Sequence, residues 1–179
     1  NIDGAKKAYD QVLNKFSDRF DITITKVDAP KRMLTSGNEA IGMGAIKAGV
    51  KFYAGYPMTP SSSLLSYMAK HERDFSIVVK HSEDEISAIG MAIGASFAGV
   101  RAMTGTSGGG FSLMTEFVGL AGICEIPLVI LEAQRPGPST GLPTRTEQCD
   151  LKFILSAGQG EFPRIVIAPG DQEECFYLT

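Results

Sequence analysis

The chain has 179 residues, of which 44% are hydrophobic and 21% charged, and its formal net charge is −3. This length is sufficient for one domain with a substantial core, and the composition excludes a wholly disordered chain. The 17 basic residues form no stripe of the kind typical of nucleic-acid-binding proteins. The uncharged segment 102–115 is interrupted by Thr, Ser and Gly residues, so it does not predict a membrane span.

Residues 1–33 differ from the rest and are predicted to form an N-terminal arm or linker. A charged amphipathic helix is expected over 6–16, and its apolar residues are Ala8, Val12, Leu13 and Phe16. A short alternating run follows at Phe20, Ile22, Ile24 and Val27. The pattern leaves open whether this arm packs or moves. Because the chain starts without Met and ends within an expected helix, we expect a piece of a longer, C-terminally truncated polypeptide.

From residue 34 to residue 179, short apolar strands alternate with helices. Ser36 and Glu39 have the spacing of a capping box, which predicts a helix from there to about residue 48. Further helices are expected at 61–70, 83–98, 112–122 and 147–155, and strands at 51–56, 75–80, 101–104, 127–132 and 164–168. This alternation predicts an α/β domain, with an open parallel sheet covered by helices on both faces.

Ligands of such sheets bind beyond the carboxyl ends of the strands, which directs attention to the loops at 56–62, 81–85, 104–110 and 133–145. In the first loop, YPMTPSSS (56–63), hydroxyl groups follow a strand, although a helix cap by Ser61 is the ordinary explanation. The glycine loop TGTSGGG (104–110) has two interpretations, an anion-binding turn or a close helix–strand contact. The P-loop and nucleophile-elbow patterns are absent, and the sequence holds 2 His, so common nucleotide-binding and serine hydrolase motifs are disfavoured.

Glu85 is the most informative residue of the acidic run HSEDE (81–85). A metal site here is disfavoured, because no further His or carboxylate cluster accompanies it. Glu83 and Asp84 are explained by the positive end of a helix dipole. Glu85, in contrast, enters a helix that is apolar nearly all round, where a carboxyl group should be paired or functional. Burial raises its pKa and the helix N-terminus lowers it, and we expect burial to dominate.

The loop QRPGPSTGLPTR (134–145) places Arg135 and Arg145 in an otherwise uncharged segment, which suits an anionic ligand. The three cysteines, Cys124, Cys149 and Cys175, have no metal or disulfide spacing. They favour a reducing, cytoplasmic location, and structural thiols are the default interpretation.

Four motifs together resemble one family. They are GYPMTPSS (55–62), EDE (83–85), AMTGTSGGGF (102–111) and the segment 134–148, with QR at its start and PSTGLPTRTEQ at its end. This set is similar to the alpha subunit of 2-oxoacid:ferredoxin oxidoreductases, in the pyrimidine-binding domain for thiamine diphosphate, over about residues 34–179. The run STGLPTRTEQ (139–148) is most similar to the 2-oxoglutarate branch. The alternatives are a pyruvate, branched-chain or indolepyruvate relative, or a non-catalytic assembly module with the same fold.

The resemblance implies oxidative decarboxylation of a 2-oxoacid with coenzyme A to acyl-CoA and CO₂, with electrons passed to ferredoxin. It implies that Glu85 hydrogen-bonds N1′ of the aminopyrimidine and is the catalytic acid, and that Thr59 and Arg135 face the substrate. Arg145 is assigned to a second carboxylate, as in 2-oxoglutarate. Further cofactor contacts are expected from Tyr56, Pro57, Thr106 and Ser107.

The resemblance also implies partner subunits. Thiamine enzymes bind the diphosphate and Mg²⁺ with a Gly-Asp-Gly motif and a later Asn, whereas residues 170–172 read Gly-Asp-Gln and cluster ligands are missing. A beta subunit is therefore expected to hold the diphosphate, Mg²⁺ and the iron–sulfur clusters, with no metal on this chain. A gamma domain preceding the arm, a hetero-oligomer or dimer, and no activity of the chain alone are further expectations.

Overall fold

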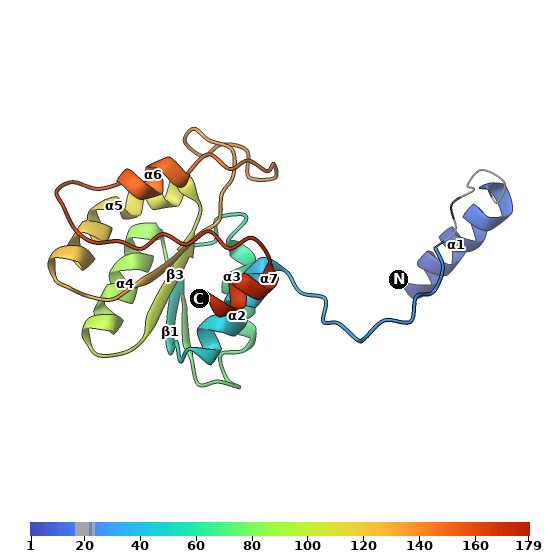
Figure 1. The fold of residues 1–179 in the computed structure, drawn as a ribbon, viewed down its shortest axis with the longest axis horizontal. Coiled ribbons are helices and arrows are strands. Elements are labelled where there is room, and N and C mark those ends of the chain that lie inside the picture. Colours follow the sequence, from blue (N-terminus) through green and yellow to red (C-terminus); the bar gives the residue numbers. More distant parts are fainter. Residues whose placement is uncertain (17–21, 23) are drawn as a thin grey trace. The chain divides into compact units, whose positions relative to one another are not determined.

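The computed structural model describes residues 1–16, 22 and 24–179, and it divides into two compact units, residues 1–34 and 35–179. In the first unit, helix α1 (Ile2–Phe16) begins earlier than the helix expected at 6–16 (Figure 1). Residues 24–34 have no regular secondary structure. Phe20, from the expected alternating run, lies outside the described residues.

The second unit is built on a parallel sheet of four strands in the order β2-β1-β3-β4. The strands are β1 (Phe52–Gly55), β2 (Val78–His81), β3 (Ala102–Thr106) and β4 (Val129–Glu132). Gly55 pairs with His81 and Gly105, and Thr106 pairs with Glu132, so all four strands end at the same edge. The predicted α/β fold with a parallel sheet is confirmed.

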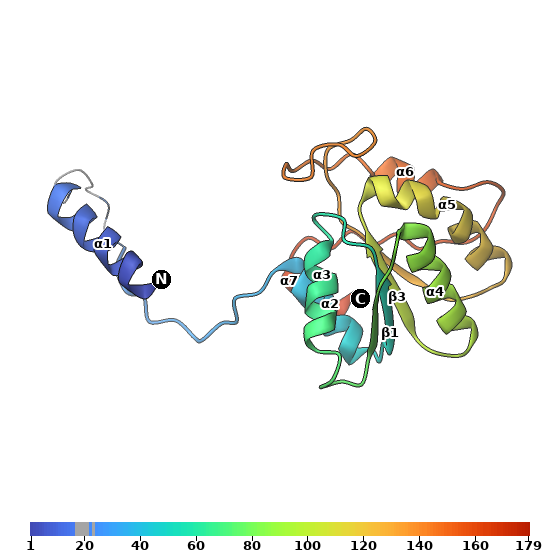
Figure 2. The same ribbon diagram turned by 180° about the vertical axis from the view of Figure 1, so that it is seen from behind.

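Helices cover both faces of this sheet (Figures 1 and 2). On one face, α2 (Gly37–Lys47) and α3 (Ser62–Lys70) build a core with Tyr53 and Met103, and α7 (Gln172–Tyr177) packs on α2. On the other face, α4 (Glu85–Phe97) and α5 (Gly108–Ile123) enclose Ala54 in a second core. The short α6 (Leu151–Ser156) meets α5 through an edge-to-face contact between Phe153 and Phe111.

Local sequence signals explain several helix starts. Ser36 and Glu39 form the expected capping box at α2. Asp84 is the N-cap of α4, because its side chain accepts a hydrogen bond from the Ser87 N–H, so the helix starts later than the expected residue 83. Asp171 caps α7 in the same way, at the Glu174 N–H, so the acid of the Gly-Asp-Gln segment has a structural role.

Two sequence predictions differ clearly from the structure. The strand expected at 164–168 is absent, because this segment joins no neighbouring strand, and Ile165 is 90% exposed. The Arg164 side chain instead donates to backbone carbonyls at the end of α6. The helix expected at 147–155 begins only at Leu151, because the Asp150 N–H bonds to the Gln134 side chain.

Smaller shifts have local causes. Strand β2 begins later than residue 75, because Ser76 has a φ of 51° and belongs to a turn. Strand β3 extends to Thr106 instead of ending at residue 104, and α5 already begins at Gly108. Among the described residues, no helix is long and apolar enough to cross a membrane.

Candidate active site at the carboxyl edge of the sheet

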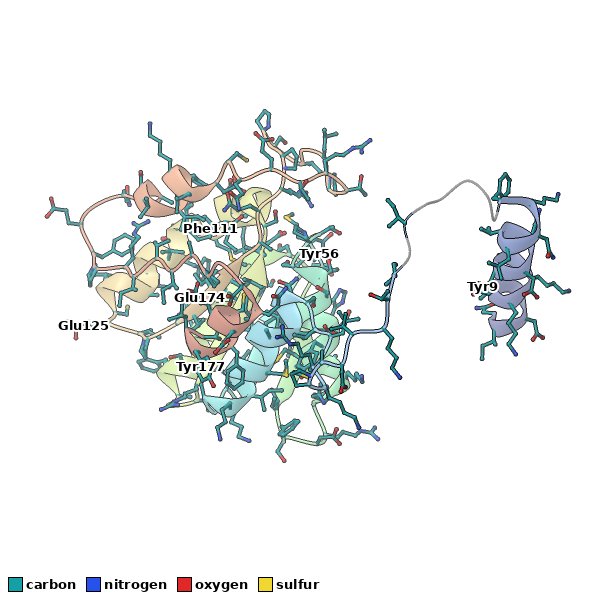
Figure 3. The ribbon with its side chains drawn as sticks, turned by 45° about the vertical axis from the view of Figure 1, so that its right-hand side comes forward. Tyr9, Tyr56, Phe111, Glu125, Glu174 and Tyr177 are labelled. Atoms are coloured by element: carbon teal, nitrogen blue, oxygen red, sulfur yellow. The ribbon has the colours of Figure 1, made fainter. Side chains whose placement is uncertain are left out.

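The candidate site lies where strands β1 and β3 end side by side. From β1 the chain continues through α3 to β2, which lies on one side of β1 in the sheet. Strand β3 lies on the other side of β1, and from it the chain continues through α5 to β4, so the connections from β1 and β3 run in opposite directions. Such divergence opens a crevice in doubly wound sheets. The loop after β1, the start of α4, the start of α5 and the loop after β4 all meet this edge. Tyr56, labelled in Figure 3, belongs to the first of these loops and is 36% exposed.

Glu85 is a buried carboxyl group at the first position of α4. Its side chain is 2% exposed, and its Oε1 has no hydrogen-bond partner among the described residues. Burial raises the pKa of Glu85. A hydrogen bond from its own backbone N–H opposes this effect, the negative charge of Asp84 adds to it, and the Arg135 cation also opposes it. The upward direction is the one expected from the sequence. An unpaired, buried carboxyl oxygen that holds a proton more firmly than usual is suited to meet a polar atom of a ligand.

Gly110 makes room for the Glu85 carboxyl group. A Cβ atom at this position would lie 2.6 Å from Glu85 Oε1 and would also collide with the Thr106 hydroxyl. The glycine loop therefore serves close packing at Gly110, because the side chain of Glu85 occupies the space a Cβ would fill. This observation favours the close-contact interpretation for the third glycine of the run.

The substitution Gly110→Ala is expected to displace the Glu85 carboxyl group. We expect the free energy of unfolding to fall by about 1–3 kcal/mol, the usual cost of overpacking a filled site. Thermal unfolding of the variant provides the measurement, and Gly94→Ala is the control, since a Cβ at Gly94 meets open space within its own unit. Equal unfolding temperatures of the two variants would contradict this contact.

Thr106 and Ser107 join strand β3 to helix α5, and both are fully buried. The Thr106 hydroxyl lies 4.0 Å from Met58 Sδ, which connects it to the loop after β1. The hydroxyl of Ser107 is buried without a hydrogen-bond partner in the part of the chain that the structure describes, and it does not cap α5. The structure thus brings these two predicted residues and Glu85 to the same edge.

Arg135 ties the loop after β4 to the loop after β1. Its guanidinium group is 5% exposed and donates to the Thr59 carbonyl at 2.8 Å and to the Thr140 carbonyl at 2.7 Å. Its Nε has no partner within the described ranges. A buried cation with a remaining donor beside an acid is an arrangement that attracts an anionic group.

A small pocket of about 230 Å³ lies between the start of α5, the loop after β4 and α6, and Arg135 lines it whereas Glu85 does not. It is lined by residues 108–109 and 135–139 and by Ser112, Asp150 and Phe153. The pocket contains the first turn of α5 and groups of both signs, the Arg135 cation and the Asp150 carboxyl group, which lies against Gly108.

The remaining predicted residues lie at the surface. Pro57, Thr59 and Arg145 are exposed, and the hydroxyl of Ser61 donates to the Met58 carbonyl at 2.6 Å instead of capping α3. The structure brings Thr59 to Arg135 through the backbone, but it does not bring Arg145 into the pocket. In the described part of the chain, no group of three or more His, Cys, Asp or Glu side chains could hold a metal ion.

Two acids at this edge were missed by the sequence analysis. Glu132 ends strand β4, and Asp150 precedes α6 and reaches the pocket. Burial, a hydrogen bond with Asp150 and the charge of Asp150 raise the pKa of Glu132 to about 8. The sequence did contain a signal for Glu132, because an acid at the end of an apolar strand is expected to lie at the ligand-binding edge of the sheet.

Comparison with known proteins shows the family of this chain. Residues 43–179 match the family described as pyruvate flavodoxin/ferredoxin oxidoreductase, thiamine diphosphate-binding. The chain belongs to this family. The resemblance inferred from the four motifs is therefore confirmed.

Relatives within the thiamine diphosphate-binding oxidoreductase family are similar over most of the chain. The alpha subunit of 2-oxoacid:ferredoxin oxidoreductase 1 from Sulfurisphaera tokodaii is 49% identical over 82% of this chain and 25% of its own length. The 2-oxoglutarate synthase subunit KorA of Archaeoglobus fulgidus is 49% identical over 82% of this chain and 42% of its own length. The chain thus spans less than half of these relatives.

A solved structure supports the same grouping. The 2-oxoglutarate:ferredoxin oxidoreductase from Magnetococcus marinus, with 2-oxoglutarate, coenzyme A and succinyl-CoA bound, matches with a TM-score of 0.83 and 36% identity. The match covers 96% of this chain and 31% of that chain.

Proposed function

We propose that residues 34–179 are the pyrimidine-binding domain of a 2-oxoacid:ferredoxin oxidoreductase alpha subunit. The enzyme oxidatively decarboxylates a 2-oxoacid with coenzyme A to an acyl-CoA and CO₂ and passes the electrons to ferredoxin. We place 2-oxoglutarate first among its substrates, because relatives similar over most of the chain are named 2-oxoglutarate synthase subunits. The observation that carries the proposal is the buried Glu85 carboxyl group, with its unpaired Oε1 at the edge between β1 and β3.

The residues at this edge fit the aminopyrimidine of thiamine diphosphate. An aminopyrimidine ring is flat and largely apolar, and its nitrogen atoms need partners. The unpaired Oε1 of Glu85 supplies an acceptor or, when protonated, a donor, and its raised pKa supports the protonated form. When bound, thiamine diphosphate supplies the nucleophilic carbon and the electron sink for decarboxylation of 2-oxoacids.

In the proposed reaction, this chain holds a proton near the cofactor and excludes water from the site. Glu85 would hold the proton that a ring nitrogen needs, and its carboxyl group packs in the space left free at Gly110, next to Thr106. Tyr56, Pro57, Thr106 and Ser107 are proposed to form the walls around the ring. A fixed acid in a buried site does not have to reorganise solvent during the reaction, which favours catalysis.

Arg135 and Thr59 are proposed to bind the 2-oxoacid. The free Nε of Arg135 is the donor that remains after its two carbonyl contacts. The Thr59 side chain is exposed at the end of the same contact and is available to a carboxylate or carbonyl oxygen. Both residues lie at the edge where Glu85 is buried, so substrate and cofactor would meet there.

The proposed partner subunits bind the groups that this chain is not expected to bind. We propose that a beta subunit holds the diphosphate, Mg²⁺ and the iron–sulfur clusters, and that the chain is inactive without it. We also propose that residues 1–33 form the linker after a gamma domain or subunit. The three cysteines are free thiols, which supports a reducing, cytoplasmic location.

The test is a substrate comparison with the assembled enzyme. The full-length alpha subunit is co-expressed with its beta partner, and viologen reduction is followed with coenzyme A and 2-oxoglutarate, pyruvate or a branched-chain 2-oxoacid. The proposal predicts the highest kcat/KM with 2-oxoglutarate. Activity with another acid alone would move the assignment to that branch, and no activity with any acid would favour the assembly module.

Arg145→Ala tests the assignment of the second substrate carboxylate. If Arg145 binds it, kcat/KM for 2-oxoglutarate falls by about ten- to a hundredfold, because a charged hydrogen bond contributes about 1.5–3 kcal/mol. Pyruvate turnover should change by less than about threefold. Arg73→Ala removes a charge from an exposed turn and serves as control. Equal losses with both acids would exclude this role for Arg145.

A further inference from the structure

The carboxyl groups of Glu132 and Asp150 come together where the loop formed by residues 133–150 begins and ends. Glu132 is the last residue of β4, and Asp150 directly precedes α6. Neither oxygen of Glu132, nor Oδ2 of Asp150, receives a hydrogen bond from an N–H or hydroxyl group of the described chain. Gln134, two residues after Glu132, accepts a hydrogen bond from the Asp150 N–H at 2.9 Å, which brings the two acids together, and a hydrogen bond with Asp150 is one cause of the raised pKa of Glu132. One shared proton therefore satisfies atoms that would otherwise be buried and unpaired.

This acid pair closes the base of the loop. The Asp150 N–H donates to the Gln134 side chain at 2.9 Å, and the Cys149 thiol lies 3.3 Å from the Arg135 carbonyl oxygen. These two contacts join the beginning and the end of the loop next to Arg135. Arg135, which donates to the Thr59 carbonyl, directly follows Gln134 in the chain.

The position of the proton follows from the neighbours. The Asp150 carboxyl group lies against Gly108, where a Cβ atom would be 2.6 Å from Oδ1. Gly108 is the first residue of α5, and backbone N–H groups at a helix N-terminus stabilise a negative charge. Glu132 ends a strand next to the fully buried Thr106 and has no such donors. The raised pKa of Glu132 assigns the shared proton to Glu132.

We propose that the proton shared by Glu132 and Asp150 locks the loop 133–150 over the active site and thereby positions Arg135, so that the loop loosens when this proton is lost at alkaline pH. Glu132 and Asp150 are positioning residues, since they act through Arg135. This role in turnover rests on the proposed function, whereas the locking of the loop does not.

The other charged and titratable groups around the pair do not replace this proton. Cys149 lies 3.4 Å from Asp150 Oδ1 and is neutral as a thiol. The Arg135 cation is committed to the Thr59 and Thr140 carbonyls. Glu147 is exposed in the same loop, and Glu85 is buried at the start of α4.

The direction of the pH dependence follows from the raised pKa. Glu132 is neutral in the folded protein below about pH 8, whereas it would ionise near 4.5 when unfolded. Its contribution to stability is therefore fully present below about 4.5, declines as the pH rises and is lost above about 8. Two adjacent carboxylates then repel each other at the base of the loop.

The first test measures the loop itself. Hydrogen–deuterium exchange of residues 133–150 is followed in the assembled enzyme between pH 6.5 and 9.5, corrected for the intrinsic pH dependence of exchange. We expect protection to fall about tenfold or more in the wild type across this range. Glu132→Gln keeps a donor to Asp150 at every pH, so its protection should stay constant within about twofold. Glu147→Gln, exposed in the same loop, is the matched control and should follow the wild type.

The second test connects the loop to the substrate. KM for 2-oxoglutarate should rise about tenfold from pH 7 to pH 9 in the wild type and in Glu147→Gln, and change little in Glu132→Gln. Asp150→Asn, whose amide donates to Glu132, is the second variant in case Glu132→Gln does not fold. Wild-type protection that does not change with pH would overturn the proposal. So would a Glu132→Gln enzyme whose protection follows the wild type. A pH-dependent loop in an enzyme with no 2-oxoacid activity would refute the proposed function and leave the lock standing.

Discussion

Replacing Glu85 with Gln in the assembled enzyme is expected to lower kcat for 2-oxoacid oxidation by about 10²–10⁴-fold, the range typical of a lost general acid or base. The amide has the same shape as the carboxyl group, so the packing against Gly110 is retained. What disappears is a group that holds and releases a proton in a buried position. Burial raises the pKa of Glu85, so the wild type keeps this proton to a higher pH than an ordinary carboxyl group does.

Glu83→Gln is the matched control for this experiment. Glu83 lies two positions earlier and is exposed, so its substitution removes one charge from the same helix end without touching the site. Kinetics of viologen reduction and the unfolding temperature are measured for both variants. A Glu85→Gln enzyme with wild-type kcat would remove Glu85 from the mechanism. Loss of activity in the control as well would show that charge at the helix end matters, and would contradict a specific role.

Replacing Arg135 with Ala is expected to have the second largest effect, a fall of about 10²-fold or more in kcat/KM. The variant leaves the carbonyls of Thr59 and Thr140 without their donor and removes a buried cation beside Glu85. Each charge-assisted hydrogen bond contributes about 1.5–3 kcal/mol, so the loss of two accounts for this magnitude.

Arg135→Lys separates the charge of this residue from its geometry. Lysine keeps the cation but cannot present the planar fork that reaches two carbonyls at once, so we expect an intermediate loss of activity. Limited proteolysis of residues 133–150 should accelerate in Arg135→Ala more than in Arg135→Lys. Full activity in the alanine variant would contradict a role of Arg135 in both substrate binding and loop anchoring.

Local signals in the sequence predicted most of the fold. The Ser36–Glu39 capping box, the glycines after helices and the apolar runs at β1, β3 and β4 each act within a few residues, so a pattern identifies them. The prediction of a strand at 164–168 was wrong, because an alternating pattern does not reveal whether a neighbouring strand is available for pairing. The late start of α6 depends on Gln134, a residue distant in sequence, and was for the same reason not predictable.

The candidate site shows the same division. Glu85 was found because a carboxyl group that enters an apolar helix is unusual by itself, and the structure places it in the core. The contacts of Arg135 with the Thr59 carbonyl, and of Glu132 with Asp150, join segments far apart in the chain. No spacing rule predicts them. The roles of Thr59, Arg145, Tyr56 and Pro57 remain predictions for the experiments above.

The most direct test of the central claim is a structure of the assembled enzyme with thiamine diphosphate bound. We expect a nitrogen atom of the aminopyrimidine within hydrogen-bonding distance, roughly 2.7–3.2 Å, of Glu85 Oε1. The ring should lie between the loop after β1 and the start of α5, and the diphosphate should be held by another subunit. An aminopyrimidine that binds elsewhere, with Glu85 still unpaired, would contradict the assignment of this chain as the pyrimidine-binding half of the active site.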